Sequence, residues 1–196
     1  MGSTFDEIYL EFYAEKGRLM WGEEPSPGVV MFSDFLKRKK MYAATILDSG
    51  CGEGRNSIYL AKQGFRVYGL DISSVAINRA KEWAKKENLS GRVHFDVGDV
   101  SKMKFRDNFF DAAIDINTMN FVRDKKAYVA ELSRVLKPEG YLLLEVLSEK
   151  NRAHGLSRDE LEWILTPHFK IVEFDEFSSS WEGIQQHQYR LTAKNR

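Results

Sequence analysis

The 196-residue chain has few of the features that mark a disulfide-bonded, membrane-spanning or strongly charged protein. Its single cysteine, Cys51, cannot form an internal disulfide and fits a reducing compartment. The 29 acidic and 29 basic residues balance, so the net charge gives no general attraction to nucleic acid or anionic lipid. No apolar run approaches the roughly 18 residues of a membrane span, and the start of the chain lacks a signal-peptide core. We therefore expect a cytoplasmic protein with no membrane or nucleic-acid partner.

Proline is also scarce, with four residues in all, and no low-complexity tract or repeat interrupts the chain. This length suits one domain with a substantial core. We predict a single domain over residues 1–196, with an N-terminal cap segment over 1–44 and a core over 45–196. Helical patterns over 5–15 and 28–39 favour a helical cap.

From residue 45 onward, short apolar runs alternate with helical patterns, which is typical of a parallel sheet covered by helices. Ser73 or Ser74, Asp124 and Ser157 stand where helix caps are expected. A segment over 137–140 is expected to end one helix before a fifth strand. The tail shows two strand patterns without an intervening helix. The pattern predicts an α/β fold that is Rossmann-like and doubly wound. Its mostly parallel seven-stranded sheet should carry an antiparallel C-terminal hairpin. Strands are expected over 46–48, 65–71, 93–97, 110–116, 141–146, 170–177 and 185–193.

A glycine-rich loop, Asp48-Ser-Gly-Cys-Gly-Glu-Gly54, joins the first predicted strand to a helix. Small residues and free N–H groups at such a turn allow a ligand to approach the backbone closely. The dinucleotide fingerprint needs its third glycine where Arg55 stands, so the spacing argues against NAD. Glu53 would also repel a pyrophosphate. We expect a ligand without phosphate groups, the alternative being a tight turn that binds nothing.

Two acids follow the next strands at the edge where a parallel sheet binds ligands. Asp71 ends the second strand and is placed to accept both hydroxyls of a ribose, the alternative being an acid that serves the following helix. Asp99 follows the third strand and could accept from an adenine amino group, although a turn residue would look the same. Together with the glycine loop, these acids indicate an adenosine-containing ligand.

Over residues 40–196 the sequence resembles the class I S-adenosylmethionine-dependent methyltransferases. The resemblance is carried by the glycine loop, Gly69-Leu-Asp71, Gly98-Asp99 and Leu136-Lys-Pro-Glu-Gly140, in that order. It implies that S-adenosyl-L-methionine is the cofactor, that Asp48 supports its methionine end, and that Asp115 and Ile116 lie beside its methyl group. Ser49 departs from the larger apolar residue usual at that position. The predicted cofactor-binding residues are Trp21, Asp48, Gly50, Cys51, Gly52, Asp71, Ile72, Asp99, Val100, Asp115 and Ile116.

A second resemblance, through residues 51–57 and Trp21-Gly-Glu-Glu-Pro25, is to the tellurite-resistance and thiopurine methyltransferases. It implies a small-molecule acceptor under an aromatic cap in which Trp21 is foremost. The alternative is that Tyr9, Phe12, Tyr13 and Trp21 are ordinary core aromatics. We expect a monomer or homodimer.

The reaction implied is an in-line displacement, for which positioning and exclusion of water matter most. His154, Asn117 and Asn120 are candidate catalytic residues because they follow predicted strands at the ligand edge. No metal-ligand spacing is present. Competing readings are an RNA or protein methyltransferase using Lys37-Arg-Lys-Lys40 and a non-catalytic S-adenosylmethionine-binding protein, whereas an NAD-dependent oxidoreductase fails on the loop.

Overall fold

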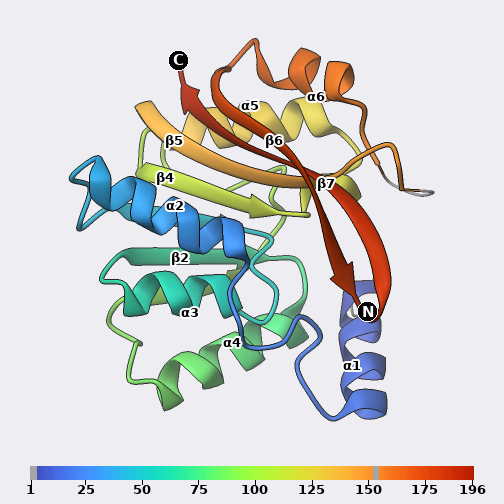
Figure 1. The fold of residues 1–196 in the computed structure, drawn as a ribbon. Helices are drawn as coiled ribbons and strands as arrows, with labels where there is room; N and C mark the ends of the chain where they lie inside the picture. The colour runs from blue at the N-terminus through green and yellow to red at the C-terminus, as the bar shows by residue number, and fades with distance from the viewer. Residues whose placement is uncertain (1–3, 152–154) are drawn as a thin grey trace. The chain divides into compact units, whose positions relative to one another are not determined.

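The computed structural model describes residues 4–151 and 155–196, and Figure 1 shows its helices and strands. The chain divides into two compact units, residues 1–103 and 104–196. The single-domain organisation stays a prediction, and the two units are described in turn.

The first unit contains three parallel strands in the order β3-β2-β1. Side chains of β1 and β2 are mostly buried, as expected for parallel strands covered by helices. The register sets Asp48 beside Gly69, and Gly69 beside Phe95. The strands are β1 (Thr45–Ser49), β2 (Arg66–Asp71) and β3 (Val93–Val97).

Four helices complete the first unit, and the two expected in the cap segment are both present. Ser73 caps α4, because its hydroxyl accepts a hydrogen bond from the N–H of Ala76 at 3.1 Å. The buried stripe of α4 includes Ile77, whereas Trp83 is only half-buried and bonds Glu87 at the surface. The helices are α1 (Thr4–Lys16), α2 (Pro27–Arg38), α3 (Arg55–Lys62) and α4 (Ser74–Lys86); α3 and α4 pack on β2 and β3 (Figure 1).

The second unit contains four strands in the order β4-β5-β7-β6, with β4 parallel to β5 and β7 antiparallel to both of its neighbours. α5 packs on β5, and α6 packs on α5 (Figure 1). The helix caps predicted at Asp124 and Ser157 are confirmed. The elements are β4 (Phe110–Ile116), η1 (Met119–Phe121), α5 (Lys125–Val135), β5 (Leu136–Leu147), α6 (Arg158–Leu165), β6 (Phe169–Trp181) and β7 (Ile184–Asn195).

Two boundaries in this unit differ from the sequence-based expectation. The segment over 137–140 does not form a separate helix stop, because α5 ends at Val135 and β5 begins at Leu136, which pairs with Phe110. The serine-rich residues 178–181, which lie between the two strands expected over 170–177 and 185–193, belong to β6, and only Glu182 and Gly183 turn the chain. Both have positive φ, 49° and 78°, as a two-residue hairpin turn requires.

The described residues thus form seven strands, and the antiparallel C-terminal hairpin is confirmed. Within the described part of the chain, no helix combines the length and apolar character needed to cross a membrane.

Gly69 is a packing constraint that the fold imposes. A Cβ at this position would lie 2.5 Å from Cδ1 of Phe95 and 2.8 Å from Sγ of Cys51. We predict that Gly69→Ala lowers the free energy of unfolding by about 1 to 3 kcal/mol through overpacking. Gly91→Ala is the control, because a Cβ there meets nothing within 4 Å. Urea denaturation of both variants measures the difference, and equal stabilities would contradict the packing account.

Candidate functional site

The glycine-rich loop folds back over the end of β2. The N–H groups of Gly50 and Cys51 both donate to the carbonyl of Leu70, at 2.7 and 3.1 Å. Gly50, Gly52 and Gly54 have φ values of 72°, 53° and 93°, which side-chain-bearing residues rarely adopt. The spacing of the three glycines therefore follows from the backbone path of the loop.

Asp71 joins this loop to the start of α4. Its Oδ2 accepts from the N–H of Gly52 at 2.8 Å, and its Oδ1 accepts from the N–H of Ser73 at 2.9 Å. The side chain is only 8% exposed, and burial raises its pKa while the backbone donors lower it. A carboxylate offers about four lone-pair positions. Each oxygen of Asp71 can therefore still accept a hydrogen bond from a ligand.

Asp48 lies buried at the end of β1 beneath the loop. The hydroxyl of Ser57 donates to its Oδ2 at 2.6 Å. Burial raises the pKa of Asp48 to about 7, the hydrogen bond from Ser57 lowers it, and the charge of Asp71 raises it. The raised pKa means that Asp48 changes its charge near neutral pH. Its hydrogen bond with Ser57 connects the end of β1 to α3, on either side of the loop.

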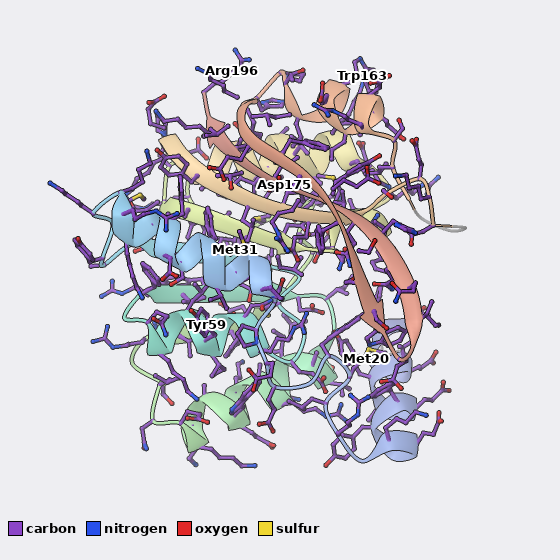
Figure 2. All side chains as sticks on the ribbon, viewed as in Figure 1. Met20, Met31, Tyr59, Trp163, Asp175 and Arg196 are labelled. Atoms are coloured by element: carbon purple, nitrogen blue, oxygen red, sulfur yellow. The ribbon has the colours of Figure 1, made fainter. Side chains whose placement is uncertain are left out.

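Glu53 has a role that the sequence did not indicate. It is buried, and its two oxygens accept from the N–H of Met20 and from Nη1 of Arg79, each at 2.7 Å. Its charge is therefore paired with Arg79, so the argument against a dinucleotide rests on the glycine spacing rather than on Glu53. Met20, labelled in Figure 2, belongs to the segment between α1 and α2.

Further polar contacts fix the same segment to α3. Nη1 of Arg55 donates to the carbonyls of Trp21 and Glu24, at 3.0 and 3.3 Å. The side chain of Asn56 accepts from the N–H of Ser26 at 2.9 Å. The first turn of α3 therefore holds the N-terminal segment against the loop.

Two aromatic residues lie over the loop as a result. A Cβ on Gly52 would be 2.8 Å from the hydroxyl of Tyr9 and 3.6 Å from Cδ1 of Trp21. Nε1 of Trp21 donates to that hydroxyl at 3.3 Å. Burial, followed by the charge of Asp71, raises the pKa of Tyr9, so its hydroxyl stays protonated. Tyr9, for which the sequence left both a cap role and a core role open, thus lies against the loop together with Trp21. A role for either residue in ligand binding stays a prediction.

The other predicted cofactor contacts of the first unit differ in how exposed their side chains are. Ile72 directly follows Asp71 and is 47% exposed, which is unusual for isoleucine. Asp99 is exposed, and its Oδ1 accepts from the N–H of Ser101 at 2.8 Å, as a turn residue does. Val100 is largely buried. Adenine binding by Asp99 stays a prediction.

Asp115 and Ile116 lie at the end of β4 in the second unit. Asp115 is fully buried, and its oxygens accept from Thr118 N at 2.8 Å, from Met119 N at 3.1 Å and from the hydroxyl of Tyr128 at 2.8 Å. These contacts join β4 to η1 and α5. Ile116 is half-buried. Proximity of either residue to a methyl group stays a prediction.

The three candidate catalytic residues have different surroundings. The side chain of Asn120 bonds both backbone groups of Leu147, at 3.0 and 3.5 Å, which is a structural role. Asn117 has φ 66° and donates its backbone N–H to the carbonyl of Glu145 at 2.8 Å. His154 lies outside the described residues. Among residues 4–151 and 155–196, no group of side chains is arranged to hold a metal ion.

Comparison with known proteins shows that this chain is similar to methyltransferases. Residues 41–193 match the family described as "Methyltransferase domain". A probable tocopherol O-methyltransferase of Oryza sativa subsp. japonica is 34% identical over 121 residues, which cover 60% of this chain and 33% of that protein. Norajmaline N-methyltransferase of Rauvolfia serpentina is 32% identical over 134 residues, covering 66% and 44%. The chain therefore spans less than half the length of these curated relatives.

A solved structure extends the likeness to almost the whole chain. The 1,6-didemethyltoxoflavin-N1-methyltransferase of Burkholderia thailandensis, with bound 1,6-didemethyltoxoflavin and S-adenosylhomocysteine, has a TM-score of 0.75 at 23% identity. The match covers 97% of this chain and 87% of that one. This likeness confirms the predicted Rossmann-like fold. The narrower resemblance to tellurite-resistance and thiopurine methyltransferases stays a prediction.

The raised pKa of Asp48 predicts a pH-dependent stability. Because its pKa in the folded protein, about 7, exceeds that in the unfolded chain, about 4, the folded state binds more protons between these values. Stability of the ligand-free protein should therefore fall as pH rises through this window. Asp48→Asn should remove the cost of ionising this buried carboxyl. Above pH 7 the variant should therefore be more stable than wild type by about 2 to 4 kcal/mol, since a tenfold change in proton affinity is about 1.4 kcal/mol.

Urea denaturation of both proteins between pH 4 and pH 8 measures this difference, and Asp34→Asn, on the exposed side of α2, controls for the loss of one charge. A constant difference between Asp48→Asn and wild type across this range would contradict the raised pKa.

Proposed function

Because this chain belongs to the methyltransferase-domain family, we propose that it binds S-adenosyl-L-methionine and transfers its methyl group to a small-molecule acceptor. The observation that carries the proposal is the bridge made by Asp71 between the glycine loop and α4. This bridge leaves two oriented carboxylate oxygens at the ligand edge of a parallel sheet.

The described residues fit the proposed cofactor. The remaining acceptor capacity of Asp71 suits the two ribose hydroxyls, and exposed Ile72 offers an apolar surface to the adenine. The loop from Gly50 to Gly52 carries a single side chain, that of Cys51, which is buried and lies against Gly69, so the backbone of Gly50 and Gly52 is free of side chains. Asp48 would support the methionine end from beneath the loop. S-adenosylmethionine, when bound, supplies an electrophilic methyl group on a positively charged sulfur.

The chain's own contribution to transfer is positioning and exclusion of water. Tyr9 and Trp21 would cover the loop side, and an apolar aromatic cover keeps water from the reacting centre. The neutral hydroxyl of Tyr9 adds no anionic charge, which suits a reaction whose positive charge disperses in the transition state. Amide side chains do not accept protons, so Asn117 and Asn120 would orient groups rather than act as a base. We propose in-line displacement on an acceptor that loses its proton readily.

Three considerations support a small acceptor. The relatives described above are named for action on tocopherol and norajmaline, and the similar solved structure holds a small heterocycle. The N-terminal segment packs on the glycine loop rather than extending a basic surface. Lys37, in the basic run weighed as an RNA contact, donates to Gln63 at 2.6 Å, and Lys39 lies over the ring of Phe35.

We predict that Asp71→Ala weakens binding of S-adenosylhomocysteine by about 100-fold or more, because two charge-assisted hydrogen bonds of about 1.5 kcal/mol or more each are lost. Asp71→Asn should have a smaller effect, since its amide oxygen still accepts. Isothermal titration calorimetry on folded protein measures both affinities. Wild-type affinity in a folded Asp71→Ala variant would refute the ribose role.

The acceptor class is tested with S-adenosylmethionine labelled in its methyl group. Incubation of the protein with fractionated cell extract should place the label mainly in small molecules, and a variant with Arg38, Lys39 and Lys40 changed to glutamine should give the same distribution. Label found mainly in RNA or protein would overturn the proposed acceptor class.

A further inference from the structure

Asp6 is an acid of α1 that bonds to the start of α4, 67 or more positions away in the sequence. Its Oδ1 accepts from the hydroxyl of Ser73 at 2.6 Å and from the N–H of Val75 at 3.1 Å. Its Oδ2 accepts from the hydroxyl of Ser74 at 3.2 Å. Asp6 is buried, and its contact with Ser73 is shielded from water, whereas its contacts with Ser74 and Val75 are partly buried. It therefore caps α4 from another helix.

The helix α1 thereby contacts the same two segments that Asp71 joins, the glycine loop and the start of α4. Asp71 bonds the N–H of Ser73 and the N–H of Gly52. On α1, Asp6 bonds the hydroxyl of Ser73, and Tyr9 lies against Gly52. Asp6 and Tyr9 are three residues apart, which places them on one face of the helix. The face of α1 that they share is thus directed at the predicted ribose site.

Polar contacts supply much of the attachment of α1 to the rest of its unit. Among the residues of α1, all of which are described, only Asp6 and Tyr9 are buried, Phe5 and Phe12 are half-buried, and Ile8 and Leu10 are exposed. A second attachment comes from Arg79, whose Nη1 donates to the carbonyl of Tyr9 at 3.3 Å and whose guanidinium lies 4.3 Å from the centre of the Tyr13 ring. Since Tyr9 is the one apolar residue of α1 that is buried, loss of the Asp6 contacts should release α1 without unfolding the core.

The charge on Asp6 has opposing effects at this place. The start of the 13-residue helix α4 carries a partial positive charge that favours a carboxylate. Asp71 lies near the same helix end, and the charge of Asp6 is one of the factors that raise the pKa of Asp71. The closed position of α1 therefore brings two carboxylates to one helix start. A ligand that donates hydrogen bonds to Asp71 relieves this repulsion and favours the closed position.

We propose that Asp6 is a positioning residue that holds α1 as a cover over Asp71 and the glycine loop, so that bound cofactor dissociates only after α1 detaches. The inference rests on the proposed cofactor role of Asp71. Asp6 acts through Ser73 and Tyr9. Its loss should speed cofactor release and should not slow cofactor binding, because the covered site must open for either step.

The experiment compares Asp6→Ala, Asp6→Asn and Glu7→Ala. Glu7 is the matched control, an exposed acid at the next position of the same helix. Stopped-flow measurement of the intrinsic tryptophan fluorescence gives the association and dissociation rate constants of S-adenosylhomocysteine. We expect Asp6→Ala to raise the dissociation rate constant by about tenfold or more, as loss of hydrogen bonds to a charged group implies, with the association rate constant unchanged or raised.

Hydrogen exchange of the amides of residues 4–16 provides a second readout that needs no turnover. In the wild type and in Glu7→Ala, S-adenosylhomocysteine should slow this exchange, and in Asp6→Ala the slowing should be lost. Asp6→Asn should be intermediate, since its amide oxygen still accepts from Ser73 or Val75. Should Asp6→Ala fail to fold, Asp6→Asn carries the test by the same two measurements.

The outcomes separate this inference from the site assignment. Wild-type dissociation and exchange in Asp6→Ala, with Asp71→Ala strongly impaired, would overturn the cover and leave the site in place. Equal impairment of Asp6→Ala and Glu7→Ala would also overturn it, because the effect would then be one of net charge. Unchanged binding in Asp71→Ala would instead remove the site on which the inference rests.

Discussion

The carboxylate of Asp71 is the interaction on which the arrangement of the first unit depends. It receives one backbone N–H from the glycine loop and one from the start of α4. A buried acid is unfavourable without such partners, so the loop and the helix must both present N–H groups to it. The positive φ values of Gly50, Gly52 and Gly54 allow the loop to do so. One side chain thereby sets the geometry of both backbone segments that face the predicted cofactor.

Polar contacts between residues far apart in the sequence hold the N-terminal segment near Asp71 and the glycine loop. Glu53 and Asn56 accept backbone N–H groups of the segment between α1 and α2, and Asp6 reaches the start of α4. These contacts keep the hydroxyl of Tyr9 over Gly52. The N-terminal segment thus packs directly on the glycine loop and α3. We expect single substitutions to weaken this attachment, because each of these contacts is a buried hydrogen bond.

Local features of the sequence predicted much of this structure. The glycine loop, the acid at the end of β2 and the caps at Ser73, Asp124 and Ser157 each depend on residues close in the chain, so spacing alone reveals them. The final hairpin was predicted from two strand patterns, but the predicted connection between the strands was longer than the two-residue turn in the structure. Serine residues favour loops in isolation, and pairing with β7 overrides that preference in β6.

The partners of Asp6, Tyr9 and Glu53 could not be predicted in the same way. Each contact joins positions far apart in the chain, and a buried acid on a helix has no periodic signature that distinguishes it from an exposed one. Asp6 and Glu7 are adjacent acids in the same helical turn, yet one is buried and the other exposed. Only the three-dimensional arrangement separates them.

The central claim is that Asp71 and the glycine loop hold the adenosyl amino acid. A crystal structure of the protein with S-adenosylhomocysteine tests this most directly. The account predicts both ribose hydroxyls within hydrogen-bonding distance of the Asp71 carboxylate, the amino acid end against residues 50–52, and the hydroxyl of Tyr9 beside it. A ligand bound elsewhere, with the Asp71 carboxylate still contacting only Gly52 and Ser73, would contradict it.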